Sequence, residues 1–224
     1  MMWMPEERAL FVHVPKTGGQ FVMRLLESLG LARATPPIGG AVRADPVAHV
    51  PAWAVSSAVD FSFGFVRHPV GWMESYYNFV LGRVADNGGR HPAWNPGMWH
   101  PLNAFDALPP GAWASADAMV DAIYDAQPAF VGRLYRLFLG DLGLGVDFIG
   151  KQETMAEDLS VVTARLGHPV APAVIAARPR INVSRGAARL TAYGINRVLA
   201  EEGPALRQYG YSDGWEYGAE HKIS

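Results

Sequence analysis

The chain has 224 residues, of which half are hydrophobic and 18% are charged, and its formal net charge is −2. This size predicts a single domain over residues 1–224, and the charge balance is not that of a protein that tracks nucleic acid or an anionic membrane. The absence of cysteine excludes disulfides, zinc–thiolate sites and thiol nucleophiles. No stretch has the length of a membrane span or the pattern of a signal peptide, so we expect a cytoplasmic protein without a membrane partner.

The first predicted unit consists of an apolar run, Leu10–Val14, a short loop, Pro15–Gly19, and then apolar residues at helical spacing. Strand, tight loop and helix form the layout of a phosphate cradle, in which glycine N–H groups, a helix N-terminus and Lys16 attract an anion. Lys16 precedes the glycines, whereas the glycines precede the lysine in the P-loop of nucleotide triphosphatases. This order disfavours an ATPase or GTPase. A solvated turn without a ligand is the alternative interpretation.

A second strand, loop and helix follow from Phe61 to Val80. The aromatic run Phe61–Val66 predicts a strand, and Pro69 suits the entrance of the helix that follows. Arg67 after the strand and Ser75 on the helix could hold a second phosphate through a guanidinium fork and a hydroxyl. In the alternative interpretation, Arg67 forms a structural ion pair with a nearby carboxylate, and Ser75 forms a hydrogen bond with the backbone of its own helix.

The stretch from about residue 87 to 113 has no period and contains three Trp, two His and five Pro. Such a stretch is typical of a functional lid, and an ordinary surface loop held by its aromatic residues is the other interpretation. Helices are predicted for Ser115–Ala126, with a Ser cap, and for Phe130–Leu139.

The third unit begins with a short buried strand, Val146–Ile149. Thr154–Glu157 has the spacing of a capping box and predicts a helix that ends before Gly167. A loop is expected over Ala171–Ala188, followed by a closing helix. Three such units indicate an α/β protein with an open parallel sheet, whose loops lie along one crevice at the carboxyl ends of the strands.

Three motifs, in order, give the chain a family resemblance. His13–Gln20 resembles the H-x-P-K-T-G-G-T loop of sulfotransferases, in the branch that includes the carbohydrate and heparan-type enzymes. Phe65–Val70 with Ser75 and Tyr76 is similar to the second motif of that family, F-V-R-x-P…S-x-Y. Phe148–Glu153, followed by Glu157-Asp158-Leu159, resembles a third block, F-[IV]-G-[RK]-x-E. The resemblance implies a three-layer α/β/α fold with a central parallel sheet, similar to that of nucleotide kinases.

The resemblance also implies a donor, 3′-phosphoadenosine 5′-phosphosulfate (PAPS), and a product, adenosine 3′,5′-bisphosphate (PAP). The residues that would hold the 5′-phosphosulfate are Lys16, Thr17, Gly18, Gly19 and Gln20. The 3′-phosphate would be held by Arg67 and Ser75, with Arg185 in a late loop as a further ligand. Gln20 and Phe21 depart from the common Thr-Ser ending, so the Gln20 amide and backbone N–H groups replace two hydroxyls. No metal is required.

Transfer to a hydroxyl also needs a base that accepts the proton. In similar enzymes a His or Glu between the two phosphate motifs often serves, and His49 is the only histidine between Lys16 and Arg67. His49 is therefore the expected base, with His100 as the fallback, and a histidine that merely packs is the alternative.

The expected function is transfer of a sulfuryl group from PAPS to a hydroxyl of a carbohydrate or small metabolite. Two other interpretations stay open: a kinase-like phosphotransferase and a non-catalytic domain that binds PAPS or PAP.

Overall fold

The computed structural model describes residues 1–31, 49–55, 58–86, 102, 108–141, 145–179, 181 and 188–215. The chain divides into two compact units, and each is described by itself. The first unit comprises Met1–Arg67, Tyr135–Asn182 and Gly218–Ser224, and the second comprises His68–Leu134 and Val183–Tyr217. The expectation of a single domain stays a prediction.

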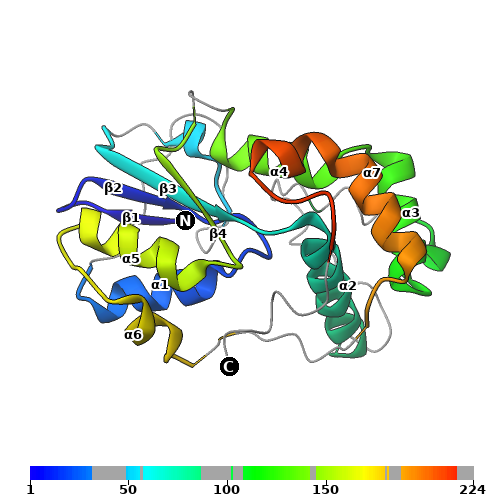
Figure 1. The fold of residues 1–224 in the computed structure, drawn as a ribbon, viewed down its shortest axis with the longest axis horizontal. Helices are drawn as coiled ribbons and strands as arrows, with labels where there is room; N and C mark the ends of the chain where they lie inside the picture. The colour runs from blue at the N-terminus through cyan, green and yellow to red at the C-terminus, as the bar shows by residue number, and fades with distance from the viewer. Residues whose placement is uncertain are drawn as a thin grey trace. The chain divides into compact units, whose positions relative to one another are not determined.

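The first unit contains a four-stranded sheet in the order β1-β2-β3-β4 (Figure 1). Its strands are β1 (Met2–Met4), β2 (Ala9–Val12), β3 (Phe61–Val66) and β4 (Phe148–Lys151). Strands β2, β3 and β4 are parallel, as predicted, and β1 pairs antiparallel with β2 through a tight turn. Strand β1 was not predicted from the sequence. The third strand was predicted two residues too early.

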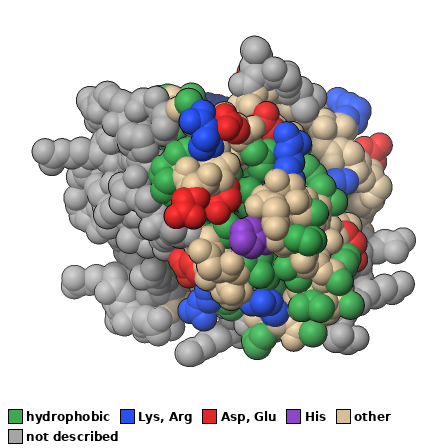
Figure 2. Space-filling view, turned by 90° about the vertical axis from the view of Figure 1, so that its left-hand side faces the viewer, with side chains coloured by type: hydrophobic (Ala, Val, Ile, Leu, Met, Phe, Trp, Pro, Cys, Tyr) green, Lys and Arg blue, Asp and Glu red, His purple; other side chains and the backbone are tan. Residues whose placement is uncertain are grey.

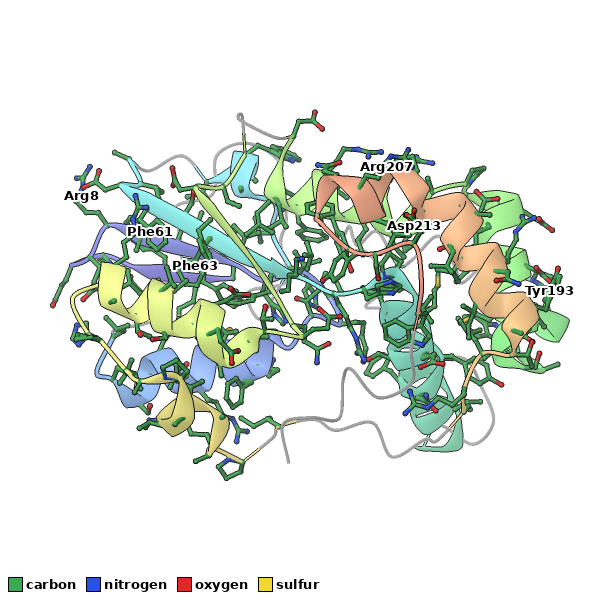
Figure 3. The ribbon with its side chains drawn as sticks, viewed as in Figure 1. Arg8, Phe61, Phe63, Tyr193, Arg207 and Asp213 are labelled. Atoms are coloured by element: carbon green, nitrogen blue, oxygen red, sulfur yellow. The ribbon has the colours of Figure 1, made fainter. Side chains whose placement is uncertain are left out.

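One face of this sheet carries the core of the first unit. Side chains alternate between the two faces of a strand, so Phe11 on β2 and Phe61, Phe63 and Phe65 on β3 share a face. Figure 3 labels Phe61 and Phe63. All four side chains are buried in one cluster with residues of α1 (Gly19–Ser28), α5 (Met155–Arg165) and α6 (Pro172–Ala176). Figure 1 shows α1 and α5 side by side beneath the strands.

The opposite face is covered by the end of α4 (Phe130–Leu139), whose residues from Tyr135 onward belong to this unit. A Cβ built on Gly64 of β3 would lie 2.3 Å from Cδ2 of Leu139, so only glycine allows this contact. Helices therefore lie on both faces of a mostly parallel sheet. The α/β class is confirmed and is compatible with three layers, and the likeness to nucleotide kinases stays a prediction.

The second unit is helical over its described residues. It contains α2 (Pro69–Asp86), the 3₁₀ turn η3 (Pro110–Trp113), α3 (Ala116–Ala126), the beginning of α4, and α7 (Ala192–Gln208). The predicted Ser cap is confirmed, because the Ser115 hydroxyl accepts a hydrogen bond of 3.1 Å from the Ala118 N–H. Most of the stretch from 87 to 113 lies outside the described residues.

Helices α3 and α7 are joined by paired side chains. The Asp117 carboxylate accepts hydrogen bonds from the N–H and hydroxyl of Thr191, and the Tyr193 hydroxyl donates to Asp121 at 2.9 Å (Figure 3). Arg197 pairs with Asp125 one turn further along α7, at 2.9 Å. The spacing of the three Asp, four residues apart, places them on one face of α3.

The structure corrects two expectations about the later part of the chain. Helix α5 begins after Thr154, but the carboxylate that pairs with Thr154 is that of Asp158 rather than that of Glu157, the predicted partner. Asp158 accepts hydrogen bonds from the Thr154 hydroxyl and the Lys151 N–H, at 2.7 Å each. The segment expected to be a loop also contains the short helix α6, which Pro172 begins.

On the face of the molecule in Figure 2, the described acidic and basic side chains are interspersed among hydrophobic ones. None of the helices in the described ranges combines the length and apolarity that crossing a membrane requires.

Candidate functional site

The predicted phosphate loop connects β2 to α1. Gly18 is the residue before the helix and has φ = 83°, in the left-handed region where glycine carries no steric penalty. The Thr17 hydroxyl is buried and donates to the Val14 carbonyl at 2.9 Å, which fixes the turn from within. Thr17 therefore has a structural bond in addition to its predicted role. The N-terminus of α1, which attracts anions, follows at once.

Lys16 has φ = 67°, also in the left-handed region. For a residue with a Cβ this conformation costs about 1 kcal/mol or more, and such strain is concentrated at functional sites. A glycine at this position would avoid the strain but would lack the ammonium group. The left-handed backbone of Lys16 therefore lowers the stability of the folded chain. Lys16 lies at the position where the sequence predicts anion binding.

Gly19 has a packing role in addition to the predicted one. A Cβ built on Gly19 would lie 1.9 Å from Cδ2 and 2.3 Å from Nε2 of His13, so the imidazole occupies the space that a side chain would need. From the sequence, both glycines are expected to allow close approach of an anion. In the structure Gly18 also supplies a turn conformation and Gly19 also admits the His13 ring, and anion binding by their N–H groups stays a prediction.

The ends of three parallel strands bring the motifs together within the first unit. Val12 of β2 pairs with Gly64 of β3, and Val66 at the end of β3 pairs with Lys151 of β4. Adjacent strands lie about 4.8 Å apart, so the loop after β2 and Arg67 after β3 follow neighbouring strand ends. The Gln152 N–H extends the ladder by donating to the Val66 carbonyl at 2.8 Å.

The turn between β4 and α5 also packs on the phosphate loop. A Cβ on Gly18 would lie 2.9 Å from Cε of Met155 and 3.6 Å from Cγ of Gln152. The third motif therefore supports the conformation of the first. Gln20 is half-buried in the first turn of α1.

Tyr135 is a residue of this region that the sequence analysis missed. Its hydroxyl donates to the Arg67 carbonyl at 2.6 Å and accepts from the Arg67 N–H at 3.2 Å, so one buried side chain holds both backbone groups of Arg67. Tyr135 looks like an ordinary core residue of α4 in the sequence. Only the fold brings it to Arg67, 68 residues away.

His49, the predicted base, lies beside the phosphate loop. Its ring centroid is 4.6 Å from that of His13 and 6.4 Å from that of Phe138 on α4. The structure thus brings His49 next to the ring that contacts Gly19, although 33 residues of sequence separate it from Lys16.

Asp60 lies elsewhere in the first unit. It directly precedes β3, at the end of the strand opposite to Arg67, and its carboxylate pairs with Arg8 at 2.7 Å (Figure 3). The hydrogen bond from Arg8 lowers the pKa of Asp60, which makes it a weaker base. Of the two side chains, His49 is therefore the one that lies beside the loop.

Two predicted ligands lie outside the described part of the first unit. Ser75 lies half-buried in the second turn of α2, in the second unit. Arg185 and the fallback base His100 lie outside the described residues. The roles of these three residues stay predictions. Within the described ranges, His, Asp and Glu side chains form no cluster of three that could hold a metal ion.

Comparison with known proteins identifies no relative: no family model, curated protein or solved structure matches the chain. The arrangement itself offers a lysine, a helix N-terminus and a nearby arginine backbone at adjacent strand ends, with a histidine beside them. These groups are suited to bind an anionic phosphate ester and to move a proton close to it.

Proposed function

We propose that the chain is a PAPS-dependent sulfotransferase that transfers a sulfuryl group to a hydroxyl of a carbohydrate or small metabolite. The observation that carries this proposal is the strained backbone of Lys16, in a loop that opens α1. The resemblance of the three motifs adds the donor. Their positions at the ends of β2, β3 and β4 support the proposal, because loops at the carboxyl ends of parallel strands form the usual ligand crevice.

In this proposal the phosphate loop holds the 5′ end of the donor. PAPS supplies a sulfuryl group joined to a phosphate that leaves as PAP. Lys16, the N–H groups after Thr17 and the Gln20 amide bind the 5′-phosphate and stabilise the negative charge that grows on its bridging oxygen. Positioning and electrostatics are expected to do most of the work, as they do in phosphoryl transfer.

His49 takes the proton of the acceptor hydroxyl in the same step. The acceptor oxygen forms a bond to sulfur, and the bond between sulfur and the bridging oxygen breaks, which releases PAP. A base of this kind typically contributes about 10²–10⁴ in rate. Arg67 is assigned to the 3′-phosphate, with its backbone fixed by Tyr135. Ser75 and Arg185 are assigned to that phosphate by the resemblance alone.

The test is transfer of ³⁵S from labelled PAPS to a panel of carbohydrate and small hydroxyl acceptors. The wild-type chain is expected to label an acceptor, His49→Ala to bind PAP but transfer about 10²–10⁴ times more slowly, and unlabelled PAP to inhibit. Binding of PAP without transfer to any acceptor would favour the non-catalytic interpretation. Phosphate transfer from Mg²⁺-ATP, without PAP binding, would favour the kinase-like interpretation and overturn the proposal.

A further inference from the structure

His13 is a buried histidine to which the proposed mechanism gives no role. It follows β2 directly, is 6% exposed, and stacks on Phe11 with ring centroids 6.0 Å apart. A buried imidazole costs free energy unless its polar atoms are satisfied, so an apolar residue would be the simpler choice if this position only filled the core. The presence of a histidine rather than an apolar residue at position 13 therefore requires an explanation.

The His13 ring connects the phosphate loop to the predicted base. On one side it occupies the space above Gly19, the first residue of α1, and on another it contacts His49 at 4.6 Å between ring centroids, with the planes tilted by 47°. Phe138 is a second ring neighbour of His49, at 6.4 Å between ring centroids. His49 thus has one aromatic neighbour directly after β2 and another on α4.

We infer that His13 is a positioning residue, which orients the imidazole of His49 relative to the phosphate loop. This inference rests on the proposed function, because it assumes that His49 accepts the proton. His13 needs no contact with the substrate in this role. It transmits the position of Gly19, and therefore of the α1 N-terminus, to the ring that must meet the acceptor hydroxyl.

The inference explains why glycine stands at position 19. A larger residue there would displace the His13 ring and, through it, His49. Misplacing a catalytic group by about 1 Å can lower a rate by about 10²-fold, so a small displacement of His49 is enough to reduce turnover.

A double-mutant cycle in the full chain tests the inference. His13→Asn is expected to lower kcat by about 10- to 100-fold, with the acceptor KM and the Kd of PAP within about twofold of wild type. In the His49→Ala background, His13→Asn should have no further effect on kcat, because His13 acts through His49. A role in loop stability alone would instead weaken PAP binding and lower kcat equally in both backgrounds, and would overturn the inference.

His168→Asn is the matched control, since it makes the same change in the turn after α5, at the end of that helix away from Gly18. It should leave kcat unchanged. His13→Gln is the second variant if His13→Asn unfolds. Proton NMR of the His49 ring is a second measurement, which does not depend on activity. Ring signals that change in the His13 variant but not in the control support the contact, and unchanged signals reject it. If the wild-type chain does not bind PAP, the proposed function is rejected rather than the role of His13.

Discussion

The hydroxyl of Tyr135 bridges the two backbone polar groups of Arg67, donating to the carbonyl at 2.6 Å and accepting from the N–H at 3.2 Å. The chain at Arg67 leaves β3 and can no longer use the sheet ladder, so this hydroxyl replaces a strand partner. The position of Arg67 therefore depends on the end of α4. This relationship links a core helix to the residue proposed to hold the 3′-phosphate.

Tyr135→Phe removes only the hydroxyl and leaves the ring. We expect a loss of about 1–3 kcal/mol in the free energy of unfolding, because both backbone groups of Arg67 lose a partner in a partly buried place. Urea denaturation measures the loss, and calorimetry should show weaker PAP binding. Tyr193→Phe, which removes an exposed hydroxyl on α7, is the control and should leave both quantities nearly unchanged. Equal stability of Tyr135→Phe and wild type would show that the bridge contributes nothing.

The strain at Lys16 can be measured with a pair of variants. Lys16→Gly relieves the left-handed backbone and Lys16→Ala does not, while both remove the ammonium group. We expect Lys16→Gly to be more stable than Lys16→Ala by about 1 kcal/mol in urea denaturation. Equal midpoints for the two variants would mean that residue 16 is not held in a strained conformation in solution.

Gly19 and Gly82 provide a contrast between two glycines in helices. A Cβ at Gly19 would clash with the His13 ring, whereas a Cβ at Gly82 in α2 meets nothing within 4 Å. Gly19→Ala should destabilise the chain by about 1–3 kcal/mol through overpacking. Gly82→Ala should stabilise it by about 0.5–1 kcal/mol, because alanine restricts the unfolded chain and favours the helix. Thermal denaturation compares the two, and a stable Gly19→Ala variant would contradict the packing described for His13.

Glu202 predicts a dependence of stability on pH. Its buried carboxylate on α7 accepts hydrogen bonds from the N–H groups of Val131 and Gly132 and from the Tyr124 hydroxyl, which caps the beginning of α4. Burial raises the pKa of Glu202 above its ordinary value of 4.5, although these bonds oppose the shift. The folded chain then binds the proton more tightly than the unfolded chain does.

The contribution of Glu202 to stability should therefore be largest below pH 4.5 and fall as pH rises toward its folded pKa. Glu202→Gln removes this titration. Urea denaturation at a series of pH values should show the free energy of unfolding of wild type falling relative to that of Glu202→Gln over this window. A difference that stays constant with pH would show that the pKa of Glu202 is not raised.

Much of the α/β fold follows from local sequence patterns. The apolar runs before Pro15 and Arg67, and the helical spacing after each, predict parallel strands with loops at one edge. The strand Met2–Met4 was missed because three residues are too few to show a period of two. Thr154 and Glu157 have the spacing of a capping box, but the fold uses Asp158, which also reaches the Lys151 N–H.

The candidate site was predictable where its residues lie within a motif and less so elsewhere. The loop pattern singles out Lys16 and Gly18, which the structure holds in left-handed conformations, and their role in binding stays a prediction. Tyr135 and the contact of His13 with His49 could not be found, because they depend on residues far apart in the sequence meeting in three dimensions. The sequence contains one local indication of the position of His13. It lies two residues after Phe11, so the two side chains share a strand face, and His13 points to the side on which α1 begins.

Calorimetric titration of PAP into wild type and Lys16→Gly tests the central claim most directly, that the loop at Lys16 holds the 5′ end of the donor. The account predicts that wild type binds PAP and that Lys16→Gly binds it about 10- to 100-fold more weakly, as expected when a charged hydrogen bond worth about 1.5–3 kcal/mol is lost. The variant should remain folded. Equal affinity of the two chains, or no binding of PAP to wild type, would contradict the account.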